Sequence, residues 1–312
     1  MTDIFRGWKE LPRFRDNGSC VTWGVFDGVH LGHQDILNTL VDEAEELGTP
    51  SVILTFDPHP VEVLRDASPD LICSVESRVR YMQELGPDVI AVVPFTDSFS
   101  DQTPEEFYES ILRKRLNTRG IVLGEGARFG RNREGDIDRL KSLSTDDNVT
   151  VTSCDHREVG GERISSTRLR KVIESGDLDE AETLLGRPFE VTGQVVRGEG
   201  RGREIGYPTA NLELDHDIYP PRGIYGGIVP LSDGVYPAVT SIGVRPTFDG
   251  GVEEVVEVHI LNFSGDLYDR VLRFKFLCFL REEEEYDSAE ELVEQIERDI
   301  SNFRDHPSHP QN

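Results

Sequence analysis

Two histidines, His30 and His33, lie three residues apart in the segment 24–33, GVFDGVHLGH, which follows a short apolar run. At the start of a helix they would face the same side, where unpaired backbone N–H groups and the helix dipole favour a phosphate. Imidazoles there can donate hydrogen bonds to a phosphoryl group as charge develops on it. A structural pair and a zinc site remain open alternatives, although no third zinc ligand stands at a convincing spacing.

The residues around the histidines are typical of a loop that holds phosphate. Gly24, Gly28 and Gly32 permit a positive φ or a close backbone approach, and Asp27 can orient the turn. The segment therefore predicts a phosphate-binding loop, and its resemblance to the signature of the nucleotidyltransferase superfamily implies nucleotide contacts from Gly24, Phe26, Asp27 and Gly28.

Two further segments allow both an anion-binding and a structural interpretation. SSTRLR, residues 165–170, is a hydroxyl-rich helix start that suits phosphate, but by itself the segment favours an ordinary serine cap with a solvated arginine. TFDPHP, residues 55–60, follows a strand and fits a rigid turn as well as a site. The candidates at the helix start are Ser166, Thr167 and Arg170.

A second group of candidates lies in GEGRGREIGYPTAN, residues 198–211. Its glycines free the backbone to wrap around a ligand, and its arginines supply positive charge in an acidic chain. Thr209 and Asn211 are two residues apart, so in an extended segment they face the same side and offer Mg²⁺ two oxygen ligands. A plain glycine-rich turn is the alternative. The expected nucleotide contacts are Gly200, Arg201 and Gly202.

Glu257 is the candidate general base of this second group. In the segment 255–263, VVEVHILNF, strand alternation puts Val255, Glu257 and His259 on one face and apolar residues on the other. A carboxylate that faces a pocket can take a proton from a hydroxyl, whereas one that faces water is merely solvated. The pattern separates Glu257 from the apolar face and leaves both roles open.

The first half of the chain alternates short apolar runs with helical patterns, as in repeated βαβ units. Apolar residues recur at helical spacing from 36 to 47, and a T-x-x-E capping box with Pro104 marks a helix that begins after Thr103. Continuous apolar runs are typical of buried parallel strands, so we predict an open, mostly parallel sheet with helices on both faces. Ligands of such sheets bind beyond the carboxyl ends of the strands, where segment 24–33 lies. The predicted strands are 19–26, 51–56, 88–95, 120–124 and 148–154.

The second half changes to a different pattern. Two short helices are expected between residues 165 and 186, the second beginning at Asp177. β-rich runs separated by Gly, Pro and Asp turns then predict a small antiparallel β-barrel. A C-terminal helix begins at the Ser288/Glu291 capping box. The barrel runs are 189–196, 223–230, 235–243, 255–263 and 271–280.

Length and composition agree with a folded protein of two domains, which we place at 1–186 and 187–304, with a disordered tail at 305–312. The four cysteines contain no CxxC pair and indicate neither a zinc knuckle nor a disulfide framework. No run approaches the roughly 20 apolar residues that cross a bilayer, and the first residues lack the plan of a secretory signal. We expect a cytoplasmic protein without a membrane partner.

The charge is unusually negative. The chain has 59 acidic and 33 basic residues, a net charge of −26, and only five of the basic residues are lysines. Repulsion of this size disfavours compaction, but molar salt screens it within about 3 Å. We therefore expect a salt-rich, halophilic cytoplasm. Such a surface also repels nucleic acid, so we expect small-molecule partners; the sequence does not indicate an oligomeric state.

Taken together and in this order, the motifs resemble those of the bifunctional riboflavin kinase/FAD synthetase family, from about residue 18 to 304. The resemblance implies a Rossmann-like α/β nucleotidyltransferase domain, then a six-stranded riboflavin kinase β-barrel with a C-terminal helix. The kinase would make FMN from riboflavin and ATP, and the FMN adenylyltransferase would join FMN to the AMP part of ATP. The motifs are GVFDGVHLGH, TFDPHP, SSTRLR, GRGREIGYPTAN, PPRGIY, SIGVRPTF and EVHILNFSGDLYDR.

The resemblance also implies roles in the first domain. His30 and His33 would stabilise the transition state at the α-phosphate of ATP, from which pyrophosphate leaves. Ser166, Thr167 and Arg170 would hold nucleotide phosphates.

In the kinase domain the same resemblance implies that Thr209 and Asn211 bind Mg²⁺ and phosphate. Glu257 would take the proton from the ribityl 5′-hydroxyl as it attacks the γ-phosphate. ATP, riboflavin and FMN are the implied substrates.

One motif departs from the family pattern. Where the family usually has GEDFRFG, or a variant with Asp or Asn in third place, residues 124–130 read GEGARFG, with Gly126 and Ala127. A polar side chain that contacts substrate and an aromatic neighbour are missing, which bears on FAD synthesis more than on the kinase. Two alternatives follow: a riboflavin kinase with an inactive or differently specific N-terminal domain, and a non-catalytic flavin-binding regulatory protein. The histidine pair and SSTRLR are intact, so we favour two activities.

Overall fold

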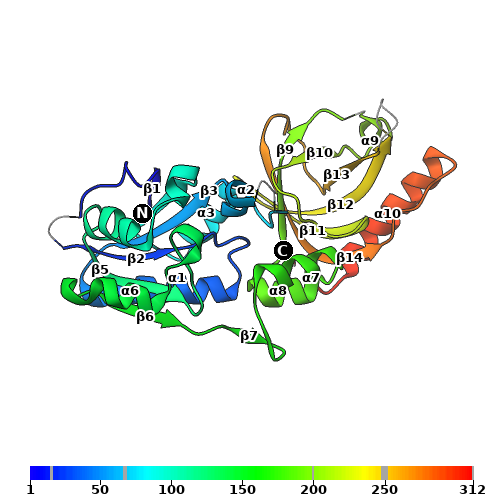
Figure 1. Ribbon diagram of the computed structural model, residues 1–312. Coiled ribbons are helices and arrows are strands. Elements are labelled where there is room, and N and C mark those ends of the chain that lie inside the picture. Colours follow the sequence, from blue (N-terminus) through cyan, green and yellow to red (C-terminus); the bar gives the residue numbers. More distant parts are fainter. Residues whose placement is uncertain (15–16, 66–68, 199, 247–251, 311–312) are drawn as a thin grey trace. The chain divides into compact units, whose positions relative to one another are not determined.

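The chain divides into two compact units in the computed structural model (Figure 1). One consists of Met1–Asp70 and Val75–Ser165, and the other of Leu71–Ser74 and Ser166–Asn312. Residues 166–186 therefore belong to the same compact unit as the barrel. The boundary predicted from the sequence lies after residue 186 instead. The described residues are 1–14, 17–65, 69–198, 200–246 and 252–310, with only the backbone described at 245–246 and 252–253.

The first unit is built around a six-stranded sheet in the order β1-β4-β3-β2-β5-β6. Its neighbouring strands pair in parallel, as the apolar runs predict. The chain passes from β2 outward through β3 and β4 on one side and through β5 and β6 on the other, so the end of β2 is a switch point of the sheet. The strands are β1 (Asp3–Arg6), β2 (Ser19–Trp23), β3 (Ser51–Asp57), β4 (Val89–Pro94), β5 (Thr118–Gly124) and β6 (Thr150–Cys154).

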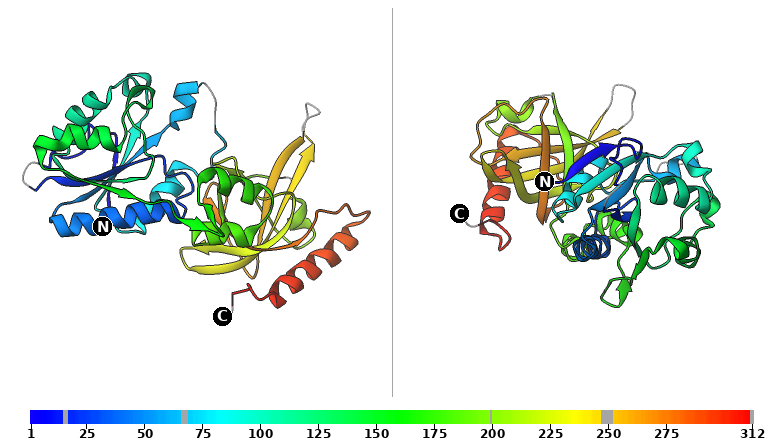
Figure 2. Two further views of the ribbon diagram at one scale, coloured as in Figure 1. Left: turned by 60° about the horizontal axis from the view of Figure 1, so that its bottom comes forward. Right: turned by 90° about the vertical axis from the view of Figure 1, so that its left-hand side faces the viewer.

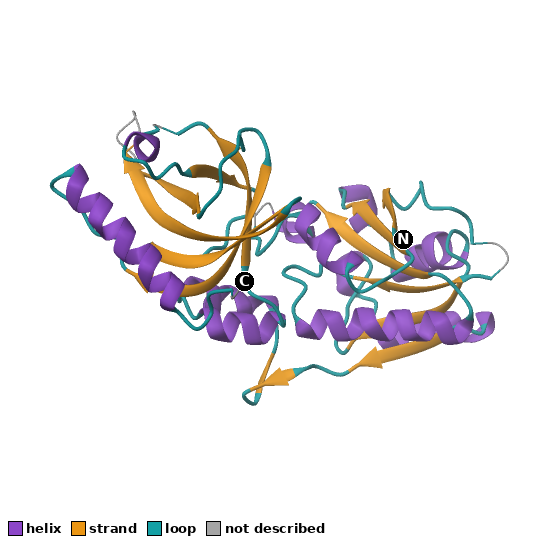
Figure 3. Ribbon diagram, turned by 180° about the vertical axis from the view of Figure 1, so that it is seen from behind, coloured by secondary structure: helices purple, strands orange, loops and turns teal. Residues whose placement is uncertain are grey.

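Helices cover both faces of this sheet, as predicted (Figures 2 and 3). Neighbouring residues of β3 enter different cores: Ile53 packs with α1 and α3, while Leu54 packs with α5, α6 and the π-helix η1. Both faces are thus apolar, which explains the unbroken apolar runs. The helices are α1 (Leu31–Leu47), α2 (Pro60–Arg65), α3 (Val75–Gln83), α4 (Asp97–Ser100), α5 (Pro104–Phe107), η1 (Tyr108–Arg113), η2 (Arg131–Arg133), α6 (Ile137–Ser144) and η3 (Thr145–Asp147), followed by the hairpin β7 (Glu158–Val159) and β8 (Glu162–Arg163).

The second unit is a closed antiparallel barrel in the order β10-β13-β12-β11-β14-β9. The barrel class and its C-terminal helix are confirmed. Closure pairs every strand with two neighbours and leaves no open sheet edge. The elements are α7 (Ser166–Glu174), α8 (Leu178–Leu185), β9 (Glu190–Val196), α9 (Arg201–Glu204), β10 (Ala210–Leu214), β11 (Gly223–Leu231), β12 (Gly234–Pro246), β13 (Val252–Ile260), β14 (Val271–Arg281) and α10 (Ala289–Asp305).

Side-chain caps mark the predicted helix starts. Thr103 and Glu106 form the reciprocal capping box of α5. Asp177 caps α8, and the Ser288 hydroxyl accepts the Glu291 N–H at the start of α10 at 3.2 Å. Short polar patterns therefore located these helix starts correctly.

Helix α10 lies along the outside of the barrel, against β12 and β14 (Figures 2 and 3). Its Phe303 ring packs onto Gly226 of β11 so closely that a Cβ there would come within 2.2 Å of the ring. Beyond Asp305, the ring of His309 still packs against Phe303, with centroids 4.9 Å apart. The predicted disordered tail thus begins at the last residue of α10, and residues 311–312 lie outside the described part.

None of the helices in the described ranges is both long and apolar enough to span a membrane.

Candidate active sites

The loop after β2 places His30 and His33 at the start of α1. His30 is the N-cap of this 17-residue helix, and its Nδ1 accepts a hydrogen bond from the His33 N–H at 3.2 Å. The imidazole rings stack with centroids 3.6 Å apart and planes 17° from parallel. His30 is buried and His33 is only partly buried, so the pair is not sealed in the interior. Both histidines thus lie at a helix mouth beyond the carboxyl end of a central strand.

The backbone of this loop takes left-handed conformations. Phe26, Gly28 and Val29 have φ angles of 55°, 78° and 40°, and such values are rare for a β-branched residue such as valine. Gly24 serves a close approach instead, because a Cβ there would lie 3.0 Å from the Phe26 ring. A left-handed conformation costs a non-glycine residue about 1–3 kcal/mol and persists only where the surroundings enforce it, as ligand sites often do.

His33 is held neutral by its surroundings. Its Nδ1 is buried without a hydrogen-bond partner among the described residues, and the Phe26 ring meets the imidazole edge-on at 5.3 Å. Burial, and then the charges of His30, Arg78 and Arg163, lower the pKa of His33 well below its usual value. An uncharged imidazole can still donate one hydrogen bond to a phosphoryl oxygen.

Two residues that hold this loop were not singled out from the sequence. Arg78 of α3 donates from Nη1 to the Val25 carbonyl at 2.7 Å and from Nη2 to the Phe56 carbonyl at 3.0 Å. Thr55 of β3 donates its hydroxyl to the same Val25 carbonyl at 3.0 Å. A signal for Arg78 was present, because it lies three residues after Val75 on the apolar stripe of α3.

The TFDPHP segment runs from the end of β3 to Pro60, the first residue of α2. The Nδ1 of His59 accepts the Val61 N–H at 3.1 Å, and the Glu62 carboxylate accepts the His59 N–H at 3.1 Å. These contacts fit the structural interpretation of a rigid turn. The link of this segment to the histidine loop comes instead from Thr55, as described above.

The SSTRLR segment opens α7, with Ser166 as its first helical residue. Its Arg168 pairs with Glu180 of α8 at 2.6 Å, which joins the two short helices. Ser166, Thr167 and Arg170 belong to the second compact unit, whereas the histidine pair belongs to the first. Their predicted grouping around one nucleotide therefore stays a prediction.

The departing GEGARFG segment follows β5, which pairs with β2, so it lies at the same sheet edge as the histidine loop. Gly126 has a φ of 75°, a left-handed value that Asn and Asp tolerate best after glycine. A Cβ at Gly126 would meet nothing within 4 Å. Ala127 packs against the core of the unit. The position thus has both the space and the backbone for the Asp or Asn of the family.

A cavity of about 600 Å³ opens in the second unit. A volume of this size suits a nucleotide or a flavin. The cavity brings together all six candidates of the second group, namely Gly200, Arg201, Gly202, Thr209, Asn211 and Glu257.

Asn211 presents an unsatisfied oxygen at this cavity. Its Oδ1 is buried without a hydrogen-bond partner among the described residues, and it faces Glu257 across the ladder between β10 and β13. Gly198 leaves room for the amide, because a Cβ there would lie 2.4 Å from the Asn211 Nδ2. An orphaned amide oxygen near a carboxylate and the Thr209 hydroxyl suits Mg²⁺, which prefers oxygen and usually takes few protein ligands.

Glu257 lies on the cavity face of β13. It lines the cavity together with Val255 and His259, while Val256 and Val258 between them are buried. The alternation read from the sequence is therefore present. Because Glu257 borders the cavity, its carboxylate is in a place where a bound hydroxyl could reach it.

Contacts along the glycine-rich loop fix the approach to β10. The Tyr207 N–H donates to the Gly202 carbonyl at 2.7 Å. His259 of β13 makes a hydrogen bond through Nδ1 with the Pro208 carbonyl at 2.9 Å, and its ring meets that of Tyr207 edge-on at 5.5 Å. These contacts hold the segment before Asn211 beside the strand of Glu257.

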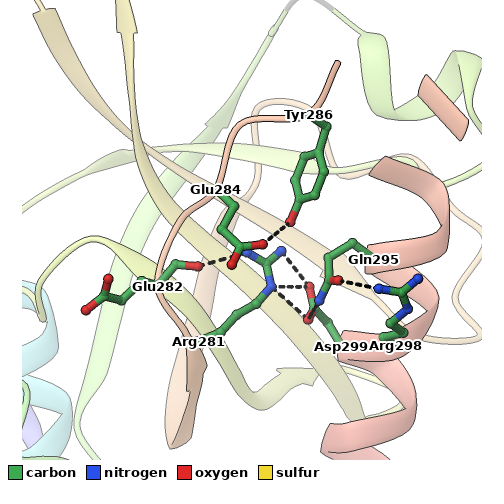
Figure 4. Close-up of polar contacts among 7 residues, drawn as sticks. All are labelled: Arg281, Glu282, Glu284, Tyr286, Gln295, Arg298 and Asp299. Carbon is green, nitrogen blue, oxygen red and sulfur yellow. Dashed lines mark hydrogen bonds and ion pairs between the residues drawn. The ribbon is translucent and has the colours of Figure 1, made fainter. Parts of the chain in front are cut away.

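Arg281 and Asp299 form a bidentate ion pair at the cavity wall (Figure 4). The Nε and Nη2 of Arg281, at the end of β14, donate to Asp299 of α10 at 2.9 and 2.8 Å. Gln295 donates to the same carboxylate at 2.9 Å. Such a pair fixes both partners in orientation. The sequence offered one signal, since Asp299 stands beside Ile300 on the buried stripe of α10.

Comparisons with known proteins match both halves of the chain. A family model for FAD synthetase matches residues 13–168, and one for riboflavin kinase matches residues 185–306. The bifunctional riboflavin kinase/FMN adenylyltransferase of Escherichia coli K12 is 35% identical over 298 residues, 95% of each chain. That of Bacillus subtilis is 34% identical over 286 residues, 90% of each chain.

A solved structure shows the same fold over the whole chain. The crystal structure of a protein described as a macrolide-efflux protein, from Streptococcus pneumoniae, is 31% identical and superposes with a TM-score of 0.85. It covers 98% of this chain and 99% of its own. From the two family models and the bifunctional relatives, the chain belongs to the family of bifunctional riboflavin kinases/FMN adenylyltransferases.

Proposed function

We propose that this chain carries out the two reactions of its family in two separate sites, an adenylyltransferase in residues 1–186 and a kinase in residues 187–304. The kinase phosphorylates riboflavin to FMN with ATP, and the adenylyltransferase joins FMN to AMP from a second ATP and releases pyrophosphate. The observation that carries the proposal is the cavity that gathers Asn211, Glu257 and the glycine-rich loop.

In the adenylyltransferase, a phosphate oxygen of FMN attacks the α-phosphorus of ATP. The bond from that phosphorus to the bridging oxygen breaks, and pyrophosphate leaves. His30 and the neutral His33 donate hydrogen bonds to the α-phosphoryl oxygens, where charge builds, and the amino end of α1 adds a favourable dipole. The backbone from Gly24 to Gly28, with Phe26 and Asp27, cradles the nucleotide. Phosphoryl transfer of this kind depends mainly on such positioning.

Ser166, Thr167 and Arg170 are proposed to hold phosphates of the same nucleotide. Their support is the hydroxyl-rich first turn of α7 and the fork of Arg170, which matches phosphate geometry.

In the kinase, Glu257 takes the proton of the ribityl 5′-hydroxyl while that oxygen attacks the γ-phosphorus of ATP and ADP leaves. The support is its place on the cavity face of β13. Gly200, Arg201 and Gly202 wrap the nucleotide phosphates, because the backbone turns there through a left-handed Gly200 with φ 78°.

Thr209 and Asn211 are proposed as the protein ligands of Mg²⁺. The buried, unpartnered Oδ1 of Asn211 supports this, since an unpaired buried acceptor is costly unless a ligand completes it. The ion, when bound, neutralises charge on the phosphates during transfer.

We further propose a cytoplasmic location with high salt. Four free cysteines suit a reducing compartment, and a net charge of −26 suits an environment that screens it. The same charge disfavours nucleic acid as a partner.

One observation favours a narrower function: the loop at 124–130 lacks the polar side chain of the family, which weakens the support for FAD synthesis and leaves the support for the kinase unchanged. An assay with riboflavin, ATP and MgCl₂ in molar KCl, followed by chromatography of flavins, separates the candidates. FMN together with FAD supports two activities. FMN alone supports the narrower kinase, and neither product supports a non-catalytic flavin-binding protein.

The His33→Ala variant tests the division of labour in the same assay. It should lose FAD and keep FMN, because the histidine pair belongs to the first unit. Loss of both products together would contradict separate sites.

A further inference from the structure

Arg78 is a buried cation beneath the histidine loop. Arg78 is only 3% exposed, although its side chain carries a full charge. It forms no ion pair with a carboxylate in the described ranges, and its Nε is buried without a hydrogen-bond partner there. Burying an unpaired charge is expensive, so a fold that keeps one invites a functional explanation.

The guanidinium joins the loop after β2 to the end of β3 at the carboxyl edge of the sheet. Nη1 reaches the Val25 carbonyl at 2.7 Å, and Nη2 reaches the Phe56 carbonyl at 3.0 Å. Val25 immediately precedes Phe26, the first left-handed residue of the histidine loop. Charge-assisted bonds to two carbonyls fix the distance between the ends of β2 and β3. The strained backbone at Phe26 and Val29 therefore starts from an anchored point.

We propose that Arg78 is a positioning residue for adenylyl transfer: by clamping the Val25 and Phe56 carbonyls, it holds the loop that carries His30 and His33 in its productive shape. The inference rests on the proposed function of the first unit and adds a residue to it. Arg78 acts through the loop and touches neither the reacting phosphate nor the flavin.

The charge of Arg78 has a second effect that geometry alone would not produce. It is one of the groups, after burial and His30 and before Arg163, that lower the pKa of His33. Removing the charge lets the pKa of His33 rise toward its usual value. If the neutral imidazole is the active form, the acidic limb of the pH profile for FAD formation then moves to higher pH.

The test compares Arg78→Met and Arg78→Lys with the wild type, using supplied FMN and ATP. A loop displaced by about 1 Å can cost about 100-fold in rate, so we expect Arg78→Met to lower kcat for FAD formation by about that factor, with a smaller change in KM. Its acidic limb should shift upward. Arg78→Lys keeps the charge but lacks the planar fork, so we expect a smaller loss of kcat and an unshifted limb.

The matched control is Arg80→Met, two residues along the same helix, where the arginine contacts the Ser77 hydroxyl and the Tyr81 ring. It should keep the wild-type kcat and pH profile. Riboflavin phosphorylation by the same variants reports on the second unit and should not change.

Wild-type kcat and an unshifted limb in a folded Arg78→Met would overturn the proposal. If that variant does not fold, Arg78→Lys alone tests the proposal. Wild-type kcat for FAD formation in Arg78→Lys would then overturn the proposed role of Arg78. Absence of FAD formation in the wild type would instead refute the proposed function of the first unit.

Discussion

Asn211 of β10 lies directly opposite Glu257 of β13 in the antiparallel ladder of the barrel. The pairing puts an unpartnered amide oxygen and a carboxylate on the wall of one cavity. These two residues are 46 positions apart in the sequence and become neighbours because of the register in which β10 pairs with β13. A shift of one residue in this register would turn one of the two side chains away from the cavity.

Replacing Glu257 with Gln should remove riboflavin phosphorylation selectively. The amide keeps the size of the side chain and cannot accept the proton, and loss of a general base typically costs about 10²- to 10⁴-fold in rate. FAD formation from supplied FMN should stay at the wild-type level, because it takes place in the other unit. Separate initial rates for the two products, measured on one preparation, check both statements. A kinase rate within twofold of the wild type would remove Glu257 as the base.

A methyl group at Gly198 should also damage the kinase. The Cβ would lie 2.4 Å from the Asn211 Nδ2 and must displace the amide, so we expect Gly198→Ala to raise the Mg²⁺ concentration needed for half-maximal FMN formation. Gly206→Ala is the control. Its Cβ would meet nothing within 4 Å, although its φ of 90° makes the change strained. A titration with MgCl₂ at fixed ATP distinguishes them; equal Mg²⁺ requirements would argue against Asn211 as a ligand.

Most of the fold could be predicted because its signals are local. The long apolar runs and the caps at Thr103, Asp177 and Ser288 identified most strands and three helix starts. The strands β1 and β10 could not be predicted in the same way. Each is only four or five residues long, and each is extended because it pairs with β4 or with β9 and β13. The strand conformation of such segments is determined by pairing with other strands and not by the β-propensity of their residues.

The candidate sites could be predicted only as far as residue type and spacing reach. The histidine pair and the Thr209/Asn211 pair are close in sequence, so a helix start for the first pair and an extended segment for the second each predict two side chains that face one side. Arg78 contacts Val25 across 53 positions, and Arg281 contacts Asp299 from a different element. The apolar stripes of α3 and α10 mark Arg78 and Asp299 as buried, but their partners are set only when the sheet and the barrel form, and no local pattern specifies them.

Restoring the family residue at position 126 should be tolerated. Asn adopts the left-handed φ of Gly126 more readily than other side chains, and the space for its Cβ is open. We expect Gly126→Asn to fold normally and to form FAD at least as fast as the wild type. Gly126→Val is the matched contrast, because a β-branched residue at φ 75° is strained by about 1–3 kcal/mol.

The contrast is measured by thermal unfolding and by FAD formation. Gly126→Val should unfold at a lower temperature than Gly126→Asn. If Asn instead slows FAD formation tenfold or more in a folded protein, the glycine is required by this chain, and the departure from the family is functional.

Salt should stabilise the protein. Because the net charge is −26, self-repulsion opposes the folded state, and its range shrinks as the ionic strength rises. We expect the unfolding midpoint to rise between 0.1 and 2 M KCl, by about 2–4 °C for each kcal/mol of repulsion removed. Sucrose is the control, since it favours burial without screening charge. Equal stabilisation by sucrose, or none by KCl, would contradict the electrostatic explanation.

Acid should destabilise the barrel unit through His216. This histidine is buried, and its Nε2 accepts the Thr192 N–H at 3.3 Å. Burial lowers its pKa from 6.5 to about 4, against the opposite influence of Asp217 and Glu190. Between these two pH values the unfolded chain binds more protons than the folded one, so stability rises with pH across the window. Lowering the pH from 6.5 toward 4 should therefore lower the free energy of unfolding by up to about 3 kcal/mol.

The His216→Gln variant isolates this effect. Glutamine can keep an acceptor for the Thr192 N–H but does not titrate, whereas the carboxylates of the chain titrate alike in both proteins. Denaturant unfolding at pH 7.5, 6, 5 and 4.5 should therefore show a steeper loss of stability in the wild type than in the variant. Parallel curves would mean that His216 is protonated equally in the folded and unfolded states. A side chain that stays buried beside Thr192 cannot behave in this way. A parallel result would thus show that the barrel end opens around His216 before the chain unfolds.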